Sequence, residues 1–241
     1  MIIFTTIAPN NLEAQTEAIN SWRKYYEVYS VNSQEEINQL TELYPQVKFI
    51  PTEELYYTAG NKTLVKVSGI LKAIQNINSK YNAIVNSDII LSSKVDPKSL
   101  CNKKTLEKAM IIGTRYELNE LPPEPFKAGY DVFIFDIKMV KHLMNDKYVI
   151  GLPWWDYWMP IAILKSLYDV YHIKNKAIFH RTHTTNWDQG YYDSFGLTLY
   201  HDLVKKGMMN EVHPSTKISE LAMGMKGYVE QFQKNIKIRY W

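Results

Sequence analysis

Short β-rich runs alternate with segments of helical periodicity through the first part of the chain. The β-rich runs lie at 2–8, 27–32, 47–50 and 82–91. Between them, apolar residues recur at the spacing of amphipathic helices, at 12–25, 34–43 and 64–81. Strands joined by helices pair in parallel and place helices on both faces of the sheet. The sequence therefore predicts an α/β protein with a mostly parallel central sheet and flanking helices.

Local signals mark the starts of two helices and one loop. Asn10 or Asn11 can cap the first helix, because the amide side chain accepts a hydrogen bond from an unpaired backbone N–H. Ser33 and Glu36 form a capping box at the start of the second helix. Residues 51–61 are predicted to be a loop that leads directly into the third helix.

The second half of the chain is less regular. Its β-rich runs lie at 109–113, 130–137, 170–173 and 177–180. Its predicted helices are 139–144, 159–167 and two in the tail, on either side of His213-Pro214. We expect one domain over residues 1–187 and a C-terminal helical extension over 188–241, packed on that domain.

Composition restricts the class of protein. Hydrophobic residues make up 46% and charged residues 22% of the 241 residues, as in globular proteins. The formal net charge of +3 is too small to predict a nucleic-acid or membrane-surface partner. No run of about 20 apolar residues predicts a transmembrane segment, and the N-terminus lacks the basic region of a signal peptide. The single cysteine, Cys101, excludes an internal disulfide, so we expect a cytoplasmic protein.

A polar tripeptide, Asn86-Ser87-Asp88, interrupts the apolar run at 82–91. Polar side chains in a buried strand are costly unless hydrogen bonds, a cation or a ligand compensate them. Ligands of open α/β sheets bind beyond the carboxyl ends of the strands, where Thr6 and Asn32 are also expected. Asp88 can hold a divalent cation that bridges two phosphates, or it can cap the next turn. We interpret these residues as a nucleotide-linked, metal-assisted site.

A second candidate carboxylate, Asp156, lies within the run Trp154-Trp155-Asp156-Tyr157-Trp158. A helix is predicted to begin there, so Asp156 can be an N-cap beside a hydrophobic staple. Alternatively, it is a general base surrounded by aromatic rings on which sugars stack. Three Trp in five residues are hard to explain as core alone. This favours a functional role and places Trp154 and Trp155 on an acceptor side.

Two further groups of residues are candidates for ligand binding. His180 and His183 can bind metal, but side chains three apart on a strand face opposite ways, so one ligand at most is expected. A neutral histidine packed in the fold is the alternative, and Arg181 between them offers a bidentate contact to a diphosphate. Lys62 can contact a diphosphate and Asn61 a base or ribose, although a simple loop and helix start fits them equally.

The strand-and-helix layout over residues 2–187, with its polar strand end at Asn86-Ser87-Asp88, resembles a GT-A-type glycosyltransferase, the nucleotide-diphospho-sugar transferase fold. The resemblance implies a Rossmann-like sheet and a D-x-D motif that binds metal and sugar nucleotide. Asp88 matches the last Asp of that motif, the direct metal ligand. Asn86 replaces the first Asp, so the resemblance does not extend to strict metal dependence. The implied cofactor is a divalent metal, Mn²⁺ or Mg²⁺, with His180 or His183 as an additional ligand.

The same resemblance implies roles for the remaining candidates. Asp156 matches the carboxylate that deprotonates the acceptor hydroxyl in inverting members, and Asp131 precedes a strand that lines the donor-sugar and acceptor pocket. The donor site is expected to consist of Thr6, Asn32, Asn61, Lys62, Asn86, Ser87 and Asp88. We therefore expect a glycosyltransferase of polysaccharide biosynthesis. It would move a sugar from a nucleotide-diphospho-sugar to a carbohydrate or glycoconjugate hydroxyl, with inversion.

Two other classes of protein stay open at this point. A nucleotidyltransferase shares the sheet, but it has a Gly-rich basic loop after the first strand, where this chain has Ala8-Pro9-Asn10-Asn11. A non-catalytic carbohydrate-binding or scaffold domain that kept the fold is the other class, since Asn86 leaves the D-x-D motif incomplete. Binding of nucleotide sugars in the presence of manganese separates this last class from an enzyme.

Overall fold

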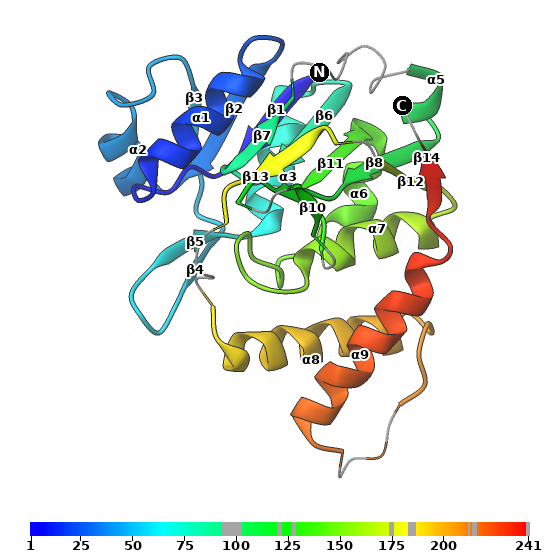
Figure 1. Cartoon of the computed structure of the whole chain (residues 1–241). Coiled ribbons are helices and arrows are strands. Elements are labelled where there is room, and N and C mark those ends of the chain that lie inside the picture. Colours follow the sequence, from blue (N-terminus) through cyan, green and yellow to red (C-terminus); the bar gives the residue numbers. More distant parts are fainter. Residues whose placement is uncertain are drawn as a thin grey trace.

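The centre of the protein is an eight-stranded sheet (Figure 1). The computed structural model describes residues 1–92, 103–119, 122–126, 129–173, 176–182, 187–211, 213 and 216–239. The strands of the sheet are β1 (Ile2–Thr5), β2 (Glu27–Asn32), β3 (Lys48–Pro51), β6 (Tyr81–Val85), β8 (Ala109–Gly113), β11 (Val132–Asp136), β12 (Asp169–Ile173) and β14 (Lys237–Arg239). Their order is β14-β12-β8-β11-β6-β1-β2-β3, and only β11 runs antiparallel to its neighbours among these described strands. The predicted mostly parallel central sheet is confirmed.

Two smaller sheets and a set of helices complete the fold. A four-stranded sheet consists of β10 (Glu124–Pro125), β9 (Tyr116–Glu117), β13 (Ile178–His180) and β7 (Ile89–Leu91). A hairpin consists of β4 (Leu55–Tyr57) and β5 (Thr63–Val65). The helices are α1 (Leu12–Trp22), α2 (Gln34–Leu40), α3 (Val67–Ile77), α5 (Lys103–Leu106), α6 (Val140–Leu143, after a 3-10 turn at Ile137–Met139), α7 (Trp155–Lys165), α8 (Gln189–Lys205) and α9 (Ile218–Gln233).

The two faces of the central sheet are covered by different elements. Successive side chains of a strand point to opposite faces, so neighbouring residues enter different cores. Ile3 and Ala83 pack in a core with α1 and with β13 of the four-stranded sheet. Phe4 and Ile84 pack in the other core, with α3 and α6 to α9. Figure 1 shows α1 and α2 on one side of the sheet and α7, α8 and α9 on the other.

The predicted loop at 51–61 and the predicted helix start at residue 64 are wrong in part. β4 and β5 pair antiparallel across this segment, so Asn61 and Lys62 lie in a hairpin turn and do not start a helix. Asn61 adopts a left-handed conformation with φ 57°. Helix α3 begins at Val67, later than the apolar pattern predicted, because the residues before it are held in strand pairing and in a bridge between Lys66 and Val149.

The two predicted helix caps have different outcomes. The capping box at α2 is confirmed, since Ser33 accepts a hydrogen bond from the Glu36 amide and the Glu36 carboxylate accepts one from the Ser33 amide. Asn11 occupies the N-cap position of α1, but its φ is 49° and its side chain makes no capping hydrogen bond. The Gln15 side chain instead pairs with the backbone N–H and C=O of Ala8, at 2.8 and 2.9 Å.

The C-terminal segment contains both predicted helices, α8 and α9, and one strand that was not predicted. This strand, β14, pairs in parallel with β12 at the edge of the central sheet. Asp202 of α8 is 5% exposed and accepts hydrogen bonds from Asn145 and Tyr148, which fastens α8 to the chain between α6 and α7. The domain boundary after residue 187 stays a prediction.

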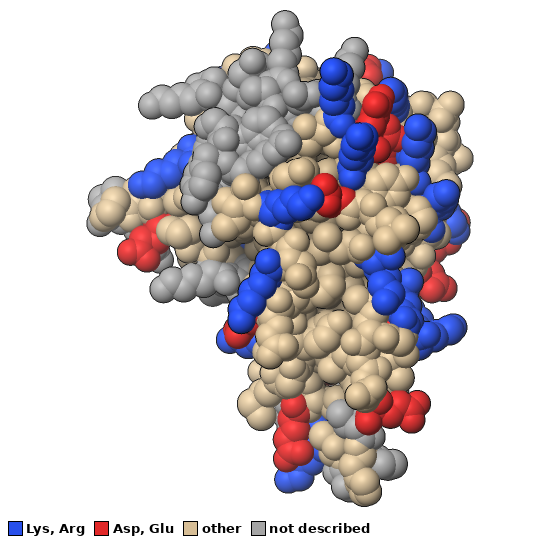
Figure 2. Space-filling view, turned by 90° about the vertical axis from the view of Figure 1, so that its right-hand side faces the viewer, with Lys and Arg blue, Asp and Glu red and all other residues tan. Residues whose placement is uncertain are grey.

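The surface carries charges of both signs. Figure 2 looks at the side of the molecule that is on the right in Figure 1, where acidic side chains stand beside basic ones in the upper part and uncharged residues dominate the lower part. Lys237 of β14 forms an ion pair with Asp169 of β12 at 2.7 Å. Within the described residues, no helix combines the length and apolar character needed to cross a membrane.

Candidate functional site

The tripeptide Asn86-Ser87-Asp88 is a turn between two sheets. The expected strand at 82–91 is divided, because β6 ends at Val85 in the central sheet and β7 begins at Ile89 in the four-stranded sheet. The turn closes with a hydrogen bond from the Ile89 amide to the Asn86 carbonyl at 3.1 Å. The polar residues therefore lie where the chain leaves the carboxyl end of β6, which is the ligand-binding edge of an open α/β sheet.

Asp88 faces the histidine that the sequence singled out. His180 ends β13, which pairs antiparallel with β7, and its side chain is buried with 4% of the residue exposed. The Nε2 atom of His180 lies 3.4 Å from Oδ2 of Asp88, while Nδ1 lies 2.8 Å from Oε2 of Glu117. Burial opposes protonation, but the hydrogen bond and charge of Asp88 and the hydrogen bond to Glu117 raise the pKa of His180 above its ordinary value.

The facing pair of Asp88 and His180 has the chemistry of a cation site. When Nδ1 of His180 carries its proton toward Glu117, the lone pair of Nε2 points at a carboxylate oxygen, and such a pair is stable only with a proton or a cation between the two atoms. A carboxylate that orients a ligating histidine in this way is the usual outer partner of a metal ligand. Among the described residues, no group of three or more His, Cys, Asp or Glu side chains forms a complete metal cage.

Two charged residues that the sequence analysis missed hold the site together. Arg115 lies at the carboxyl end of β8 and donates to Oε1 of Glu117 and to Oδ1 of Asp131, both at 2.7 Å. Burial tends to raise the pKa of Glu117, but hydrogen bonds from Arg115, His180 and Thr182 keep it below its ordinary value. The sequence contains one indication of this pair. Arg115 and Glu117 stand on either side of Tyr116, so in a short strand both charges lie on the same face.

Asp131 connects this network to the Asn86 turn. Its side chain accepts from Nδ2 of Asn86 at 3.0 Å, and its carbonyl accepts from the Asn86 amide at 3.1 Å. Burial raises the pKa of Asp131, and the Arg115 guanidinium opposes this rise. The residue is 2% exposed, and its second carboxylate oxygen, Oδ2, has no hydrogen-bond partner within the described part of the chain. Such an oxygen can accept a hydrogen bond from a ligand hydroxyl.

The backbone of Tyr130, the residue before Asp131, connects Asp156 to this network. The Tyr130 amide donates to Oδ2 of Asp156 at 3.1 Å, and Gly129, with φ 79°, approaches the same oxygen so closely that a Cβ at this position would collide with it. Burial raises the pKa of Asp156 to about 7, and the charge of Asp131 adds to this rise while backbone amides oppose it. A carboxylate that titrates near neutral pH is suited to general base catalysis.

The predicted cap and aromatic wall around Asp156 are wrong. Trp154, with φ 78°, holds the N-cap position, and Asp156 is the second residue of α7. Trp154 and Trp155 are only 2% and 3% exposed, so these rings cannot form a wall for an acceptor. Trp155 packs on Phe133 of the central sheet, and the indole N–H of Trp154 donates to the Tyr192 carbonyl at 2.8 Å. The run of tryptophans is explained by the hydrophobic core, because Trp155 packs on the sheet and Trp154 on α8.

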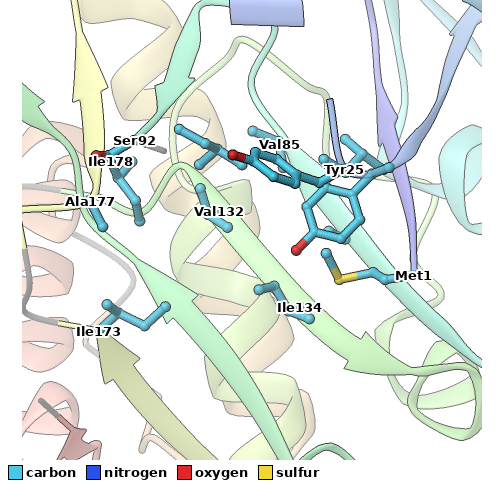
Figure 3. Close-up of a pocket in the computed structure, with 13 residues that line it drawn as sticks. Met1, Tyr25, Val85, Ser92, Val132, Ile134, Ile173, Ala177 and Ile178 are labelled. Carbon is cyan, nitrogen blue, oxygen red and sulfur yellow. The ribbon is translucent and has the colours of Figure 1, made fainter. Parts of the chain in front are cut away.

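An apolar cavity lies on the sheet face away from α7. Figure 3 shows its lining by Met1 and Tyr25 at one end and by Ala177 and Ile178 at the other, with Val85 between them. The cavity measures about 30 Å³ and is lined almost entirely by apolar side chains. Its size and lining exclude a diphosphate and match a packing defect of the core, so it is separate from the polar site described above.

Comparisons with known proteins identify the fold. No family model and no curated protein matches the chain by sequence. The crystal structure of S. aureus TarS 1-349 in complex with UDP-GlcNAc superimposes with a TM-score of 0.55 at 12% identity, covering 98% of this chain and 72% of that chain. The complex of the same protein with UDP gives 0.51 at 13% identity and covers 97% and 72%. The chain has the GT-A fold. A longer TarS structure gives 0.50 at 13% identity, and only 43% of its length is covered.

The GT-A fold places several predicted donor residues near one another and others elsewhere. Asn86, Ser87 and Asp88 occupy the turn at the carboxyl end of β6, next to β1 in the sheet, and Thr6 directly follows β1. Asn32 is 1% exposed, and its amide group bonds to Ser30, Ile7 and Glu36, which gives it a structural role.

The remaining predicted residues lie outside this turn. Asn61 and Lys62 lie on the β4–β5 hairpin, so their contact with a donor stays a prediction. Arg181 forms an exposed, two-pronged ion pair with Glu17, at 2.7 and 3.1 Å, in place of the diphosphate contact that its position suggested. His183 lies outside the described residues.

Proposed function

We propose that this protein is a glycosyltransferase that moves a sugar from a nucleotide-diphospho-sugar to an acceptor hydroxyl, with inversion and with the assistance of a divalent metal. One observation carries the proposal. Tyr130 and Asp131 are adjacent, and the first donates its amide to Asp156 while the second bonds to Asn86. The Tyr130-Asp131 dipeptide therefore holds the candidate base Asp156 near the turn that contains Asp88. A displacement at one sugar carbon requires the base and the leaving-group site to lie this close together.

The choice of donor rests on the fold and its solved neighbour. TarS, which shares the GT-A fold with this chain, was crystallised with UDP-GlcNAc and with UDP. A UDP-sugar is therefore the first donor to test. The acceptor we propose is a carbohydrate or glycoconjugate of polysaccharide biosynthesis. A single cysteine suits the reducing cytoplasm, which we propose as the compartment.

Asp88 of the turn and His180 at the end of β13 are the residues suited to bind a divalent cation. Asp88 and His180 would hold Mn²⁺ or Mg²⁺, and Glu117 would keep a proton on Nδ1 of His180 so that the lone pair of Nε2 is directed at the cation. Two protein ligands are enough for cations that also bind phosphate oxygens and water. When bound, the cation supplies positive charge where negative charge develops on the leaving diphosphate.

The acceptor side of the reaction depends on Asp156. Its carboxylate takes the proton of the acceptor hydroxyl while that oxygen forms a bond to the anomeric carbon and the bond from this carbon to the diphosphate breaks. The free carboxylate oxygen of Asp131 would accept a hydrogen bond from a hydroxyl of the donor sugar. The two carboxylates thus have separate tasks, Asp156 in proton transfer and Asp131 in orientation.

Calorimetry and a transfer assay test the proposal together. The wild-type protein is expected to bind UDP-GlcNAc or another UDP-sugar, more tightly with Mn²⁺, and to release UDP slowly by hydrolysis. Asp88→Asn is expected to weaken binding, whereas Asp156→Asn should keep UDP binding and lose transfer by about 100-fold or more. Glu124→Gln, at an exposed position of β10, is the matched control. A wild-type protein that binds no nucleotide sugar with metal present would show a scaffold domain instead.

A further inference from the structure

Two partly exposed aromatic side chains lie at the start of α8. Trp187 precedes Asp188, the N-cap residue of α8, and Tyr192 lies in the first turn of this helix. Their rings are nearly parallel, with an interplanar angle of 20° and centroids 6.0 Å apart. Unlike Trp154 and Trp155, both are accessible from solvent, so they can receive a ligand.

The pair is fastened to the helix that carries Asp156. The Tyr192 ring packs against Trp154 with centroids 4.8 Å apart, and the Trp154 ring packs against Tyr157 at 5.6 Å. The hydrogen bond from the Trp154 indole to the Tyr192 carbonyl fixes the first turn of α8 relative to the start of α7. Burial raises the pKa of Tyr192, and the charges of Asp193 and Asp156 add to this effect.

The β4–β5 hairpin borders the same surface. The Ala59 amide donates to the Tyr191 hydroxyl at 3.3 Å, and Tyr56 packs edge-on against Phe195 of α8 with centroids 5.9 Å apart. Tyr57 of this hairpin is 70% exposed. Figure 1 shows the hairpin beside the beginning of α8. The start of α8 is therefore held between the hairpin and α7.

The charges around the aromatic pair favour a neutral ligand. Asp188 caps α8, Asp193 accepts a hydrogen bond from Gln189, and Glu230 of α9 acts electrostatically on Tyr192. This acidic surrounding repels phosphates and nucleotides, but carboxylates accept hydrogen bonds from hydroxyl groups. A flat ring with carboxylates beside it matches a pyranose, whose C–H face packs on an aromatic ring while its hydroxyls point outward.

We propose that Trp187 and Tyr192 form a stacking subsite for one pyranose ring of the carbohydrate acceptor and orient its hydroxyl toward Asp156. The role of this subsite in transfer depends on the proposed function. Its binding of sugar does not depend on donor chemistry, so it can be tested separately.

Saturation-transfer NMR with the β-methyl glycosides of glucose, galactose, mannose and N-acetylglucosamine tests the subsite directly. At least one glycoside is expected to bind the wild-type protein, and its signal should be lost in Trp187→Ala and Tyr192→Ala. Tyr192→Phe keeps the ring and should retain binding. Tyr25→Ala removes an aromatic side chain that is 49% exposed and packs against Tyr26, away from α8, so it is the matched control. No binding of any glycoside, or binding unchanged in both alanine variants, overturns the subsite.

A kinetic measurement separates this subsite from the donor site. If transfer is observed, Tyr192→Ala should raise the acceptor KM by about tenfold, equivalent to about 1.4 kcal/mol, while the Kd for UDP stays at the wild-type value. An equal loss of UDP affinity would show that the substitution disturbs the fold, which thermal unfolding of each variant also reports, and would overturn the assignment. Glycoside binding without binding of any UDP-sugar would leave the subsite standing and reject the proposed function.

Discussion

The Nε2 atom of His180 lies 3.4 Å from Oδ2 of Asp88, and Glu117 holds the opposite nitrogen of the same imidazole. The three side chains come from three separate strands or turns, at the end of β13, after β6 and at the end of β9. Their alignment therefore depends on the tertiary fold and on the Arg115 side chain that holds Glu117. A carboxylate beside Nδ1 favours a proton on that nitrogen, so in the proposed metal site Glu117 should control metal affinity without touching the metal.

Glu117→Gln is expected to weaken Mn²⁺ binding by about 10- to 100-fold, because a neutral amide no longer fixes the tautomer of His180 or increases its basicity. Titration of UDP-sugar binding or transfer with Mn²⁺ measures this change. The maximal rate at saturating Mn²⁺ should recover in large part. If saturating Mn²⁺ does not restore activity, Glu117 stabilises the folded structure and does not act on metal affinity.

The rate of transfer should follow the ionisation of Asp156. Burial and the neighbouring Asp131 raise the pKa of this carboxyl to about 7, and only its deprotonated form accepts the acceptor proton. Transfer should therefore rise with pH through about 7 and level off above it. A pH profile of transfer at saturating donor checks this. A rate independent of pH between about 5 and about 9 would contradict the assignment of Asp156 as the base, since about one pH unit on either side of a pKa spans most of its titration.

The same carboxyl should make the folded protein less stable as pH rises. Its pKa is about 7 in the folded protein against an ordinary value of 3.8, so the folded state binds more protons than the unfolded state between these two pH values. The free energy of unfolding then falls as pH rises through this window. Asp156→Asn removes this dependence, and urea unfolding at about pH 4 and about pH 8 should show a smaller fall than in the wild type, by about 1 kcal/mol or more.

The parts of the fold that were predictable depend on local pattern. The capping box of Ser33 and Glu36 and the alternating strands follow from neighbouring residues, and the structure confirms them. The Trp154 to Trp158 run was misinterpreted, because aromatic content alone does not distinguish a core from a binding wall. What decides it is α8, far along the chain, which covers Trp154.

Only some residues of the candidate site could be identified from the sequence, because the others are recognised by contacts between distant segments. Asp88, Asp156 and His180 are identifiable as polar residues in apolar surroundings. Arg115 and Glu117 follow a buried strand in an ordinary charged segment, and only the pairing of β9 with β13 brings Glu117 to His180. The alternation of these two residues around Tyr116 places both charges on one face, but the sequence does not show what they contact there, because those contacts depend on distant strands.

Two glycine substitutions test whether the close approach of the Gly129 backbone to Asp156 is required for transfer. Gly129 has φ 79°, and a Cβ at this position would collide with the Asp156 carboxylate, whose Oδ2 accepts from the next amide along the chain. Gly129→Ala should therefore lower the free energy of unfolding by about 1–3 kcal/mol and reduce transfer. Gly224, in the middle of α9, has open space where a Cβ would lie, so Gly224→Ala should raise the free energy of unfolding by about 0.5–1 kcal/mol and leave transfer unchanged. Urea unfolding and the transfer assay on both variants give the comparison, and a Gly129→Ala protein with wild-type stability and rate would show that this backbone contact does not position the base.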